Sequence, residues 1–493
     1  MDEKSFIPMF IPDTAKNDVR SLLEYAAQKG IREIDFRFTD LWGRDHHKSY
    51  LTYFLKKYTG ISNSEGDLGS RCVGFDGSSI RGWKNIYESD MLLLPDASTA
   101  FIDPFYTSPT IAVRCNVYDP ATEKPYELDP RSIALKAEEY LRSMLGENAI
   151  AYFGPEPEFF IFDKVILSGE DNKNVKIFSR EVPSEDNVFH NARLKEGYFP
   201  ILADKLQDVR SDMVRTMEDL GITIECQHHE VARAGQAEID PRYSTLTAMA
   251  DTLQLMKYVI YNIARKHGMV ATFMPKVFAN DNGSGMHVHQ SIWAGEVPLF
   301  AGKGLYGLSD LALEYAAGII KHGPSIYPFT NPTTNSAARL KPGFEAPTYL
   351  AMSFSNRSAA IRIPNYEPNN PKAKRLEVRF PDATANPYLA FTAMLLAGLD
   401  GIKKGLREFP IVEKKDIGHL SPEEKQGIHE LPPSLTEAHK HLANDISWLA
   451  EIIPSEVVGA LRKKADDDAQ ELEELRDSPL ERRLVKEFEL YMV

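Results

Sequence analysis

The 493-residue sequence is poor in three features, and each shortage excludes a class of protein. It has only three cysteines, far apart and without the spacing of a metal site, so no disulfide framework and no cysteine-rich zinc site is predicted. It has fewer basic than acidic residues and a formal net charge of −14, which argues against binding to nucleic acid or to an anionic membrane surface. It has no run of about 18 apolar residues, so no transmembrane helix is predicted.

The amino-terminal twelve residues are acidic and interrupted by prolines, unlike a signal peptide with its basic and apolar regions. With cysteines that are expected to be reduced, this indicates a cytoplasmic protein. A chain of 493 residues is too long for one ordinary core, so two or more domains are expected. The stretch 118–131, rich in proline and aspartate, predicts a boundary between domains at 1–120 and 121–493.

Periodicity and turn residues predict the main elements. Strands are expected at 34–38, 149–162, 222–226 and 271–278, and helices at 132–146, 204–220, 245–267 and 386–404. The polar stretch 163–197 is expected to be a long loop or insertion. The charge-dense segment 412–487 is expected to be mostly helical, with a solvated face.

Two glutamates, Glu156 and Glu158, lie two residues apart in an apolar run. Residues i and i+2 of a strand point to the same face, so both carboxylates are expected on one side of a sheet. Two neighbouring negative charges in apolar surroundings are costly, and a divalent cation is the simplest group to offset that cost. The alternative is a solvent-facing edge strand in which Pro155 and Pro157 mark a bulge.

A second acidic pair, Glu230 and Glu238, flanks a turn rich in alanine and glycine. Two more carboxylates would complete an oxygen-rich site of the kind that Mg²⁺ or Mn²⁺ prefers. A surface turn with scattered acids is the alternative. His228 and His229 are adjacent and therefore point opposite ways on a strand, so both are not expected to be ligands.

A glycine-containing loop, Asn-Gly-Ser-Gly at 282–285, precedes His287 and His289. Such a loop lets backbone approach a ligand, and the two histidines share one strand face. Imidazole can ligate Mn²⁺ or Mg²⁺ or donate to a phosphate oxygen. The alternative is a pair of core histidines with satisfied hydrogen bonds.

Five arginines between residues 339 and 379 stand out because planar guanidinium groups suit carboxylates and phosphates. They are Arg339, Arg357, Arg362, Arg375 and Arg379. Structural ion pairs are the alternative for any one of them. Prolines and glycine around Glu345 predict a shaped loop that could cover a site, with an ordinary surface loop as the alternative.

Hard-cation ligands and arginines together indicate anionic substrates and metal-assisted phosphoryl transfer. The sequence has no Walker A motif and no kinase glycine loop with a catalytic His-Arg-Asp. If ATP is used, cations, arginines and His289 are therefore expected to hold its phosphates.

Seven segments in order resemble bacterial type I glutamine synthetases, and the resemblance runs from about residue 15 to the end. They are Phe75–Trp83, Gly154–Phe160, His229–Glu238, Asn282–His289, Asn331–Pro347, Glu377–Asp382 and Glu487–Tyr491. The resemblance implies an α+β chain with a small β-grasp-like amino-terminal domain and a large catalytic domain built on an antiparallel sheet and surrounding helices. It also implies a dodecamer of two hexameric rings, with active sites shared between neighbours.

The reaction implied by the resemblance joins glutamate and ammonia at the expense of ATP, through a γ-glutamyl phosphate. One cation, Mg²⁺ or Mn²⁺, would lie on Glu158, Glu230 and Glu238, and another on Glu156, His287 and Glu377. Glutamate would contact Asn282, Gly283, Arg339 and Arg379. ATP would contact Glu225, Tyr243, His289, Ser291, Arg357, Arg362, Lys372 and Arg375. The ammonium pocket would combine Asp76 and Ser79 of a neighbouring subunit with Tyr198, Glu230 and Glu345, Asp76 taking the proton from ammonium and Glu345 closing the site.

The sequence departs from the family pattern at His429. Family members controlled by adenylylation carry a tyrosine just before a Leu-Pro-Pro segment, and here His429 takes that place. No adenylylation is therefore expected at this residue, although the long segment 163–197 resembles the adenylylated subgroup. Two other functions remain open: a γ-glutamyl ligase acting on an amine or polyamine, and a catalytically silent homologue.

Overall fold

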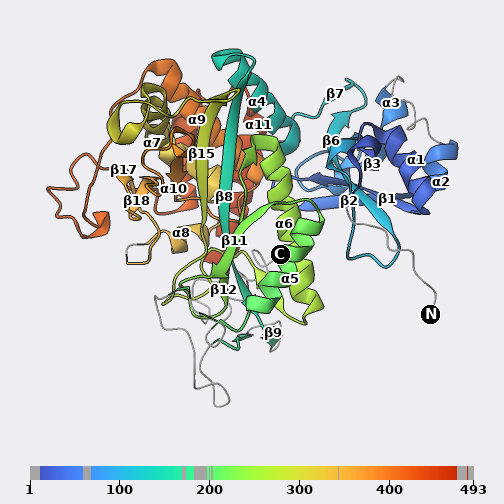
Figure 1. Ribbon diagram of the computed structural model, residues 1–493, viewed down its shortest axis with the longest axis horizontal. Coiled ribbons are helices and arrows are strands. Elements are labelled where there is room, and N and C mark those ends of the chain that lie inside the picture. The colour runs from blue at the N-terminus through green and yellow to red at the C-terminus, as the bar shows by residue number, and fades with distance from the viewer. Residues whose placement is uncertain are drawn as a thin grey trace. The chain divides into compact units, whose positions relative to one another are not determined.

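The computed structural model of the chain divides into two units (Figure 1), and each is described by itself. The first comprises Met1–Ile133 with Arg215–Ile222, and the second comprises Ala134–Val214 with Thr223–Val493. The residues that the structure describes are 11–58, 68–168, 174–181, 197–198, 200, 204–341, 343–474 and 486.

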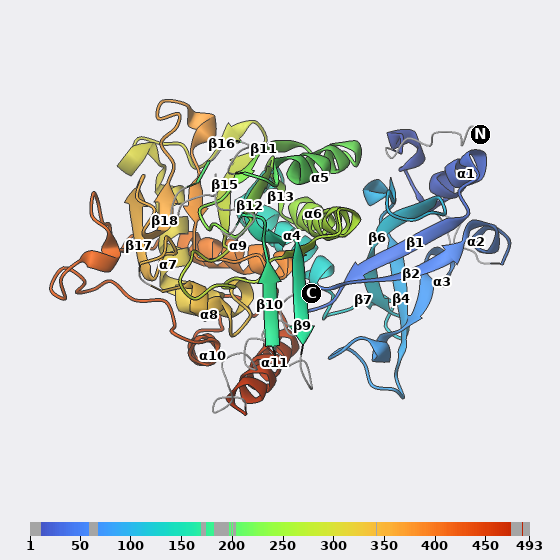
Figure 2. The same cartoon turned by 90° about the horizontal axis from the view of Figure 1, so that it is seen from below.

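The first unit contains a mixed sheet with the strand order β2-β1-β6-β4-β3, and β5 and β7 both pair with β6 (Figure 2). Its strands are β1 (Glu33–Thr39), β2 (Asp45–Leu51), β3 (Val73–Asp76), β4 (Asp90–Pro95), β5 (Phe101–Ile102), β6 (Thr110–Asp119) and β7 (Lys124–Pro125). Its helices are α1 (Val19–Lys29), α2 (Thr52–Tyr58) and α3 (Leu68–Arg71). The strand predicted at 34–38 is confirmed as part of β1.

Local sequence explains the ends of α1. The Asp18 carboxylate accepts a hydrogen bond from the backbone N–H of Ser21 and so caps the first turn. Gly30 ends the helix with φ of +68°, a left-handed conformation that glycine adopts without steric cost. A polar residue at one end and a glycine at the other thus fix both limits of the helix.

The second unit contains a long sheet with the strand order β11-β12-β8-β15-β19-β18-β17. Short strands β13 and β14 pair with β8, and β16 pairs with β15. The strands are β8 (Ala149–Phe162), β11 (Ile224–His229), β12 (Gln236–Pro241), β13 (Ser244–Thr245), β14 (Val270–Thr272), β15 (Met286–Ala294), β16 (Val297–Pro298), β17 (Tyr349–Phe354), β18 (Ala359–Ile363) and β19 (Leu376–Val378). Its pairs are antiparallel except β17 with β18.

Helices accompany this sheet: α4 (Pro130–Leu145), α5 (Gln207–Asp219), α6 (Leu246–Lys266), α7 (Asp310–Thr330), α8 (Ser336–Arg339), α9 (Pro387–Lys404), α10 (Leu435–Asn444) and α11 (Ser455–Glu473). Two glycines bring α7 and α9 close together. A methyl group on Gly318 would meet the carbonyl oxygen of Ala397 at 2.1 Å, and one on Gly401 would meet that of Glu314 at 2.1 Å. None of the helices in the described ranges is long and apolar enough to cross a membrane.

The structure confirms the predicted helices at 132–146, 204–220, 245–267 and 386–404 to within a few residues. Three expectations need correction. Strand β14 ends at Thr272 rather than at 278, because Pro275 has no N–H for a ladder. Within 412–474 the only helices longer than a single turn are α10 and α11, since three prolines and two glycines interrupt 418–433.

The third correction concerns the polar segment 163–197, which was expected to lack regular structure. Strands β9 (Lys164–Ser168) and β10 (Asn174–Phe178) form an antiparallel hairpin there. Residues 169–173 and 182–196, like 475–485, lie outside the described residues. The two strands, Lys-Val-Ile-Leu-Ser at 164–168 and Asn-Val-Lys-Ile-Phe at 174–178, are each only five residues long and lie in a stretch that is polar overall, so they did not indicate the hairpin.

A buried histidine on α10 predicts that the chain loses stability in mild acid. The Nδ1 atom of His439 is buried and has no hydrogen-bond partner in the described part of the chain. Burial lowers the pKa of His439 to about 4, so the unfolded chain, with a histidine pKa of about 6.5, binds this proton first as the pH falls.

His439→Leu should therefore gain stability relative to the natural chain by about 3 kcal/mol between pH 7 and pH 4. Urea unfolding at a series of pH values measures this difference. His441→Leu, on an exposed position of the same helix, is the matched control for the substitution itself. A constant difference for His439→Leu would contradict the argument.

Candidate active site

One face of the long sheet carries acidic, histidine and arginine side chains in cross-strand pairs. Directly opposed residues on neighbouring strands point to the same face, so these pairs form a continuous row across the sheet. The pairs are His228 with Glu238, Glu238 with Glu158, Glu156 with His287, His289 with Glu377, and Glu377 with Arg362. The prediction that Glu156 and Glu158 share a face is confirmed, as it is for His287 and His289.

The first cluster in the row combines Glu156, His287 and Glu377, whose ligand atoms lie within 4.8 Å of one another. Oε2 of Glu156 is 3.2 Å from Nδ1 of His287, and Oε1 is 2.8 Å from Nε2 of His289. Arg375 donates from Nε to Nδ1 of His289 at 3.2 Å, so Nε2 of His289 carries the hydrogen that Glu156 accepts. Both rings contact the Glu156 carboxylate, so their hydrogen bonds are satisfied as in the alternative, and their role as cation or phosphate ligands stays a prediction.

Glu377 is buried and forms ion pairs with both Arg362 and Arg379. Burial favours its neutral form, but Arg379, followed by His289 and His287, lowers the pKa of Glu377 to about 2. Two of the five arginines thus form the ion pairs that the sequence left open. Burial and then Arg379 lower the pKa of His287 to about 4, so this ring is neutral and able to ligate a cation at neutral pH.

The second cluster combines His228, Glu230 and Glu238, again within 4.8 Å. Nε2 of His228 is 3.1 Å from Oε1 of Glu238, and its Nδ1 is 3.7 Å from Oε1 of Glu230. Glu158 adjoins them: burial, followed by the charge of Glu230, raises the pKa of Glu158 to about 8. His229 points the other way into the protein and contacts Glu181, as expected for neighbours in a strand.

The turn between Glu230 and Glu238 is shaped by Gly235. Its φ is +91°, and a methyl group there would meet the carbonyl oxygen of Ile161 at 2.3 Å, so only glycine fits. The next residue, Gln236, donates from its amide to Oε2 of Glu158 at 3.1 Å. The turn therefore positions Glu230 and Glu238, and its residue Gln236 also orients the carboxylate of Glu158.

The glycine loop makes room for a buried arginine. A methyl group on Gly283 would meet the carbonyl oxygen of Pro275 at 2.3 Å, and one on Gly285 would meet Nη2 of Arg339 at 2.3 Å. The glycines make room for the buried Arg339 side chain, which donates to the carbonyl oxygens of Phe380, Pro381 and Arg379. The loop is thus held by an arginine, and the approach of its backbone to a ligand stays a prediction.

A cavity of about 450 Å³ opens on the Glu156 side of the row. Aromatic rings form one wall: Tyr152 lies 5.3 Å from Tyr243 and 6.0 Å from Trp293 between centroids. The cavity is lined by six residues predicted to bind ATP, namely Glu225, Tyr243, His289, Ser291, Lys372 and Arg375. Polar and cationic groups beside an aromatic wall suit a nucleotide.

A second, smaller cavity of about 40 Å³ lies on the Glu158 side. Its lining includes Glu158, Glu230, Asn282, Gly283, His287, Arg339, Glu345, Arg357 and Arg379. Oδ1 of Asn282 is buried there without a hydrogen-bond partner among the described residues. Arg357 lines this cavity rather than the larger one, and Arg362 lines neither, which separates both from the other predicted ATP contacts.

Tyr198 packs against this site from the end of the segment that the structure does not describe. Its ring centroid is 4.8 Å from that of His228, and its φ of +59° is unusual for a residue other than glycine. Burial, followed by Glu230, raises the pKa of Tyr198, so its hydroxyl keeps its proton.

Asp76 and Ser79 belong to the first unit, at the junction of β3 with a short 3₁₀ turn, Gly77–Ser79. The Asp76 carboxylate accepts from the backbone N–H of Ser78 at 2.9 Å and from the hydroxyl of Ser79 at 2.8 Å. Hydrogen bonds from Ser78 and Ser79 lower the pKa of this exposed carboxyl, so Asp76 is an anion at neutral pH. The contact of Asp76 and Ser79 with a neighbouring subunit stays a prediction.

Several site residues were missed by the sequence analysis. Tyr152 precedes Glu156 by four residues on β8, so alternation alone would have placed it on the same face. His228 was left undecided because nothing in the sequence shows which of two adjacent histidines faces the acids. Trp293, two residues after Ser291 on β15, and Gln236, two residues before Glu238 on β12, could have been found by the same alternation.

Comparisons with known proteins agree with this arrangement. The sequence matches the family description "Glutamine synthetase, catalytic domain" over residues 127–484 and "Glutamine synthetase, beta-Grasp domain" over residues 30–120. It is 48% identical over 480 residues to a glutamine synthetase of Aquifex aeolicus, covering 95% of this chain and 98% of that protein. It is also 48% identical over 440 residues to a 3-hydroxylaminophenol mutase of Cupriavidus pinatubonensis, covering 87% and 91%. A solved glutamine synthetase of Plasmodium falciparum aligns with a TM-score of 0.80 and 27% identity over 92% of this chain and 96% of that one.

Proposed function

The chain belongs to the glutamine synthetase family, and we propose that it joins ammonia to L-glutamate with ATP, giving L-glutamine, ADP and phosphate. The proposal is carried by one observation: two clusters of cation ligands stand side by side on a sheet face between two cavities. Adjacent sites of this kind suit the transfer of a phosphoryl group from a nucleotide to a small acid.

The residues fit two hard divalent cations, Mg²⁺ or Mn²⁺. Glu158, Glu230 and Glu238 have raised pKa values because burial and their neighbours' charges favour the neutral form, which indicates that a compensating positive charge is missing. Glu158, Glu230 and Glu238 would hold one cation, with Glu156, His287 and Glu377 holding the other. When bound, the cations neutralise charge on the phosphates and the glutamate carboxylate.

We assign the larger cavity to ATP. Glu225 would contact the ribose and Tyr243 would lie near the base, with the aromatic wall in support. His289, Ser291, Lys372 and Arg375 would bind the phosphates. Arg357 and Arg362 were also assigned to ATP, and their reach to the γ-phosphate is part of the proposal.

We assign the smaller cavity to glutamate, through Asn282, Gly283, Arg339 and Arg379. The unsatisfied Oδ1 of Asn282 supports this, because a buried acceptor without a donor suits the ammonium group of an amino acid. The substrate carboxylate would attack the γ-phosphate in line and give a γ-glutamyl phosphate.

Ammonia would then displace the phosphate. Asp76 and Ser79 of a neighbouring subunit would join Tyr198, Glu230 and Glu345 in an anionic pocket that binds ammonium. Asp76 would take the proton that converts ammonium to ammonia, and Glu345 would exclude water and accept the later proton. The shared pocket requires an oligomer, and we propose the dodecamer of two hexameric rings; an active monomer in a mass measurement would overturn it.

Replacement of Glu345 by alanine tests the assignment of the covering loop. Glu345→Ala should lower kcat for glutamine formation by about 100-fold, because a proton acceptor and a barrier to water are lost together. Glu296→Ala, at the exposed turn between β15 and β16 in the same unit, is the control and should keep its kcat. An unchanged rate in Glu345→Ala would remove that residue from the mechanism.

Acceptor preference distinguishes this function from its rivals. Purified chain with Mn²⁺, ATP, glutamate and hydroxylamine should form γ-glutamyl hydroxamate, and ammonium should be a better acceptor than ethanolamine or putrescine. Preference for an amine would indicate a γ-glutamyl-amine ligase, and no product would indicate a silent homologue. Because one similar protein is named 3-hydroxylaminophenol mutase, 3-hydroxylaminophenol should be assayed in parallel without ATP.

Two further expectations remain proposals. The division into domains at 1–120 and 121–493 is supported by the spans of the two family matches, which end at 120 and begin at 127. His429 is exposed beside a cavity that also contains Lys321 and Arg407. Mass spectrometry of the chain after incubation with an adenylylating extract should find no AMP adduct on residue 429.

A further inference from the structure

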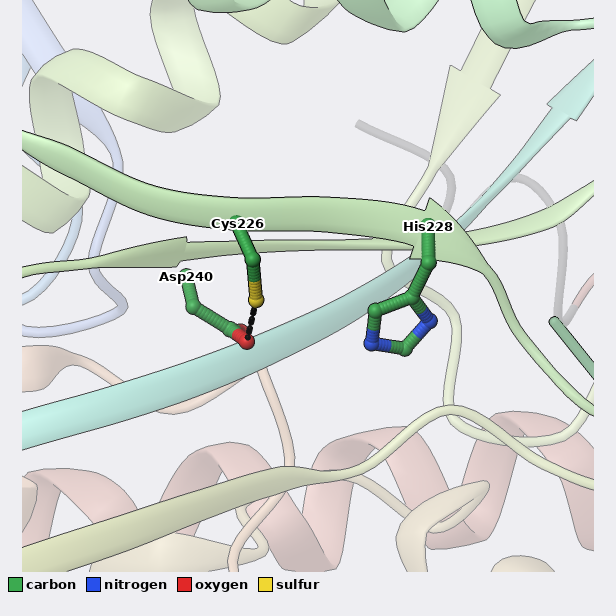
Figure 3. A group of neighbouring side chains, drawn as sticks. All are labelled: Cys226, His228 and Asp240. Atoms are coloured by element: carbon green, nitrogen blue, oxygen red, sulfur yellow. Dashed lines mark hydrogen bonds between the residues drawn. The ribbon is translucent and has the colours of Figure 1, made fainter.

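A thiol, an imidazole and a carboxylate gather at one end of the long sheet, on Cys226, His228 and Asp240 (Figure 3). Cys226 and His228 alternate on β11, and Asp240 is the cross-strand partner of Cys226 on β12, so all three point to one face. One ligand atom from each lies within 4.8 Å of the other two. The Cys226 thiol donates to Oδ2 of Asp240 at 2.9 Å.

The Asp240 carboxylate is not satisfied by these contacts. Its Oδ1 atom is buried and has no hydrogen-bond partner within the described ranges. A buried carboxylate oxygen without a donor is costly, and a cation is one of the few groups that would remove the cost. This unsatisfied oxygen is an observation independent of the clustering itself.

The surroundings argue against a disulfide at Cys226. The two other cysteines, Cys72 and Cys115, are both buried and belong to the first unit. The second unit therefore offers Cys226 no thiol partner of its own. The neighbours that it does have, an imidazole and a carboxylate, are both cation ligands.

We propose that Cys226, His228 and Asp240 form a third cation site that takes a thiophilic divalent ion, Zn²⁺. Sulfur, nitrogen and oxygen donors together favour Zn²⁺ over Mg²⁺ or Mn²⁺, which prefer oxygen. On binding, the ion replaces the thiol proton, which passes to solvent, and the thiolate becomes a ligand. Three protein ligands leave the fourth position of a tetrahedral ion to water.

The site shares a residue and a cavity with the machinery assigned above. His228 also contacts Glu238, and Asp240 lines the larger cavity together with Glu225. A Zn²⁺ ion bound to His228 and Asp240 would compete with the contact between His228 and Glu238. It would also lie at the wall of the larger cavity and hinder nucleotide binding there. This consequence, unlike the binding itself, rests on the proposed function: Zn²⁺ should raise the KM for ATP.

Cobalt gives a direct test that does not depend on activity. The full chain, freed of cations with a chelator, is titrated with Co²⁺, and the near-ultraviolet absorption of a cobalt–thiolate bond is recorded. At saturation the absorption should correspond to one thiolate-bound Co²⁺ per chain, because the two other sites contain no thiol, and Zn²⁺ should abolish it. Cys226→Ser should lack the absorption, whereas the matched control Cys72→Ser, which also keeps two thiols, should retain it.

Affinity for Zn²⁺ is then measured by competition with a chromophoric chelator. Cys226→Ser should bind Zn²⁺ about 100-fold more weakly or worse, because loss of even an outer partner costs 10–100-fold. Asp240→Asn should keep the cobalt–thiolate absorption with a weaker affinity. Circular dichroism establishes that each variant is folded.

Absence of the absorption in the natural chain, or its persistence in Cys226→Ser, would overturn the site. An inactive chain that still shows the absorption would overturn the proposed function while supporting the site. A rise in the KM for ATP with Zn²⁺ that disappears in Cys226→Ser would support both.

Discussion

Glu158→Gln should fold normally yet form glutamine about a thousandfold more slowly than the natural chain, because a ligand charge at the reacting centre is lost. Glutamine keeps the shape of a protonated carboxyl, and its oxygen can still accept from the Gly285 backbone and the Gln236 amide. The pKa of about 8 already makes the neutral form of Glu158 the favoured one at neutral pH without a cation. The variant therefore resembles the cation-free protein, in which the Glu158 carboxyl is neutral. It differs only in that residue 158 can no longer become negatively charged.

Two measurements separate this effect from misfolding. In the presence of a chelator, the natural chain should lose stability as the pH rises from about 4 to about 8, because the folded state holds the Glu158 proton and the unfolded chain releases it. Glu158→Gln should lack that decline. Added Mn²⁺ should raise the unfolding temperature of the natural chain more than that of the variant; equal shifts would show that Glu158 is no ligand.

Glu377→Gln should be the most destabilising single change in the row, by about 3 kcal/mol. It removes the negative charge that Arg362 and Arg379 share, and both guanidinium groups are buried. Breaking a buried ion pair on one side leaves an uncompensated charge, which costs more than the pair itself contributes.

Urea unfolding in a chelating buffer measures the loss without any contribution from cations. Glu296→Gln, an exposed glutamate at the β15–β16 turn, is the control and should change stability by less than about 0.5 kcal/mol. Because the folded pKa of Glu377 is depressed, its contribution is present above about pH 4.3 and lost as the pH falls toward about 2. A difference between natural chain and variant that persists at pH 2 would contradict the ion-pair explanation.

Local patterns predicted much of this site because strand alternation needs no knowledge of the partner strand. Spacing of two residues was enough to place Glu156 with Glu158, and His287 with His289, on one face. The same reasoning recovered the long helices α6 and α9 from the spacing of their apolar residues, and Asn386 and Gly405 also mark the two ends of α9.

The features of the site that could not be predicted from the sequence depend on contacts between distant residues. Nothing near Glu238 indicates that it lies opposite Glu158, 80 positions earlier, since sheet pairing is decided by the whole core. The close approach of Gly285 to Arg339 could not be predicted for the same reason, because Arg339 lies far along the chain. The hairpin of β9 and β10 was missed because each strand is only five residues long within a stretch that is polar overall.

The row of cross-strand partners has a consequence for how activity is gained and lost. A slip of one residue between β8 and β15 would turn His287 and His289 to the opposite side of the sheet. The same slip would separate Glu156 from both rings, and no partial rearrangement would keep half of the assembly. A preparation refolded from denaturant should therefore contain fully active molecules and inactive ones. Its specific activity should report the fraction of active molecules, each of which works at the full rate.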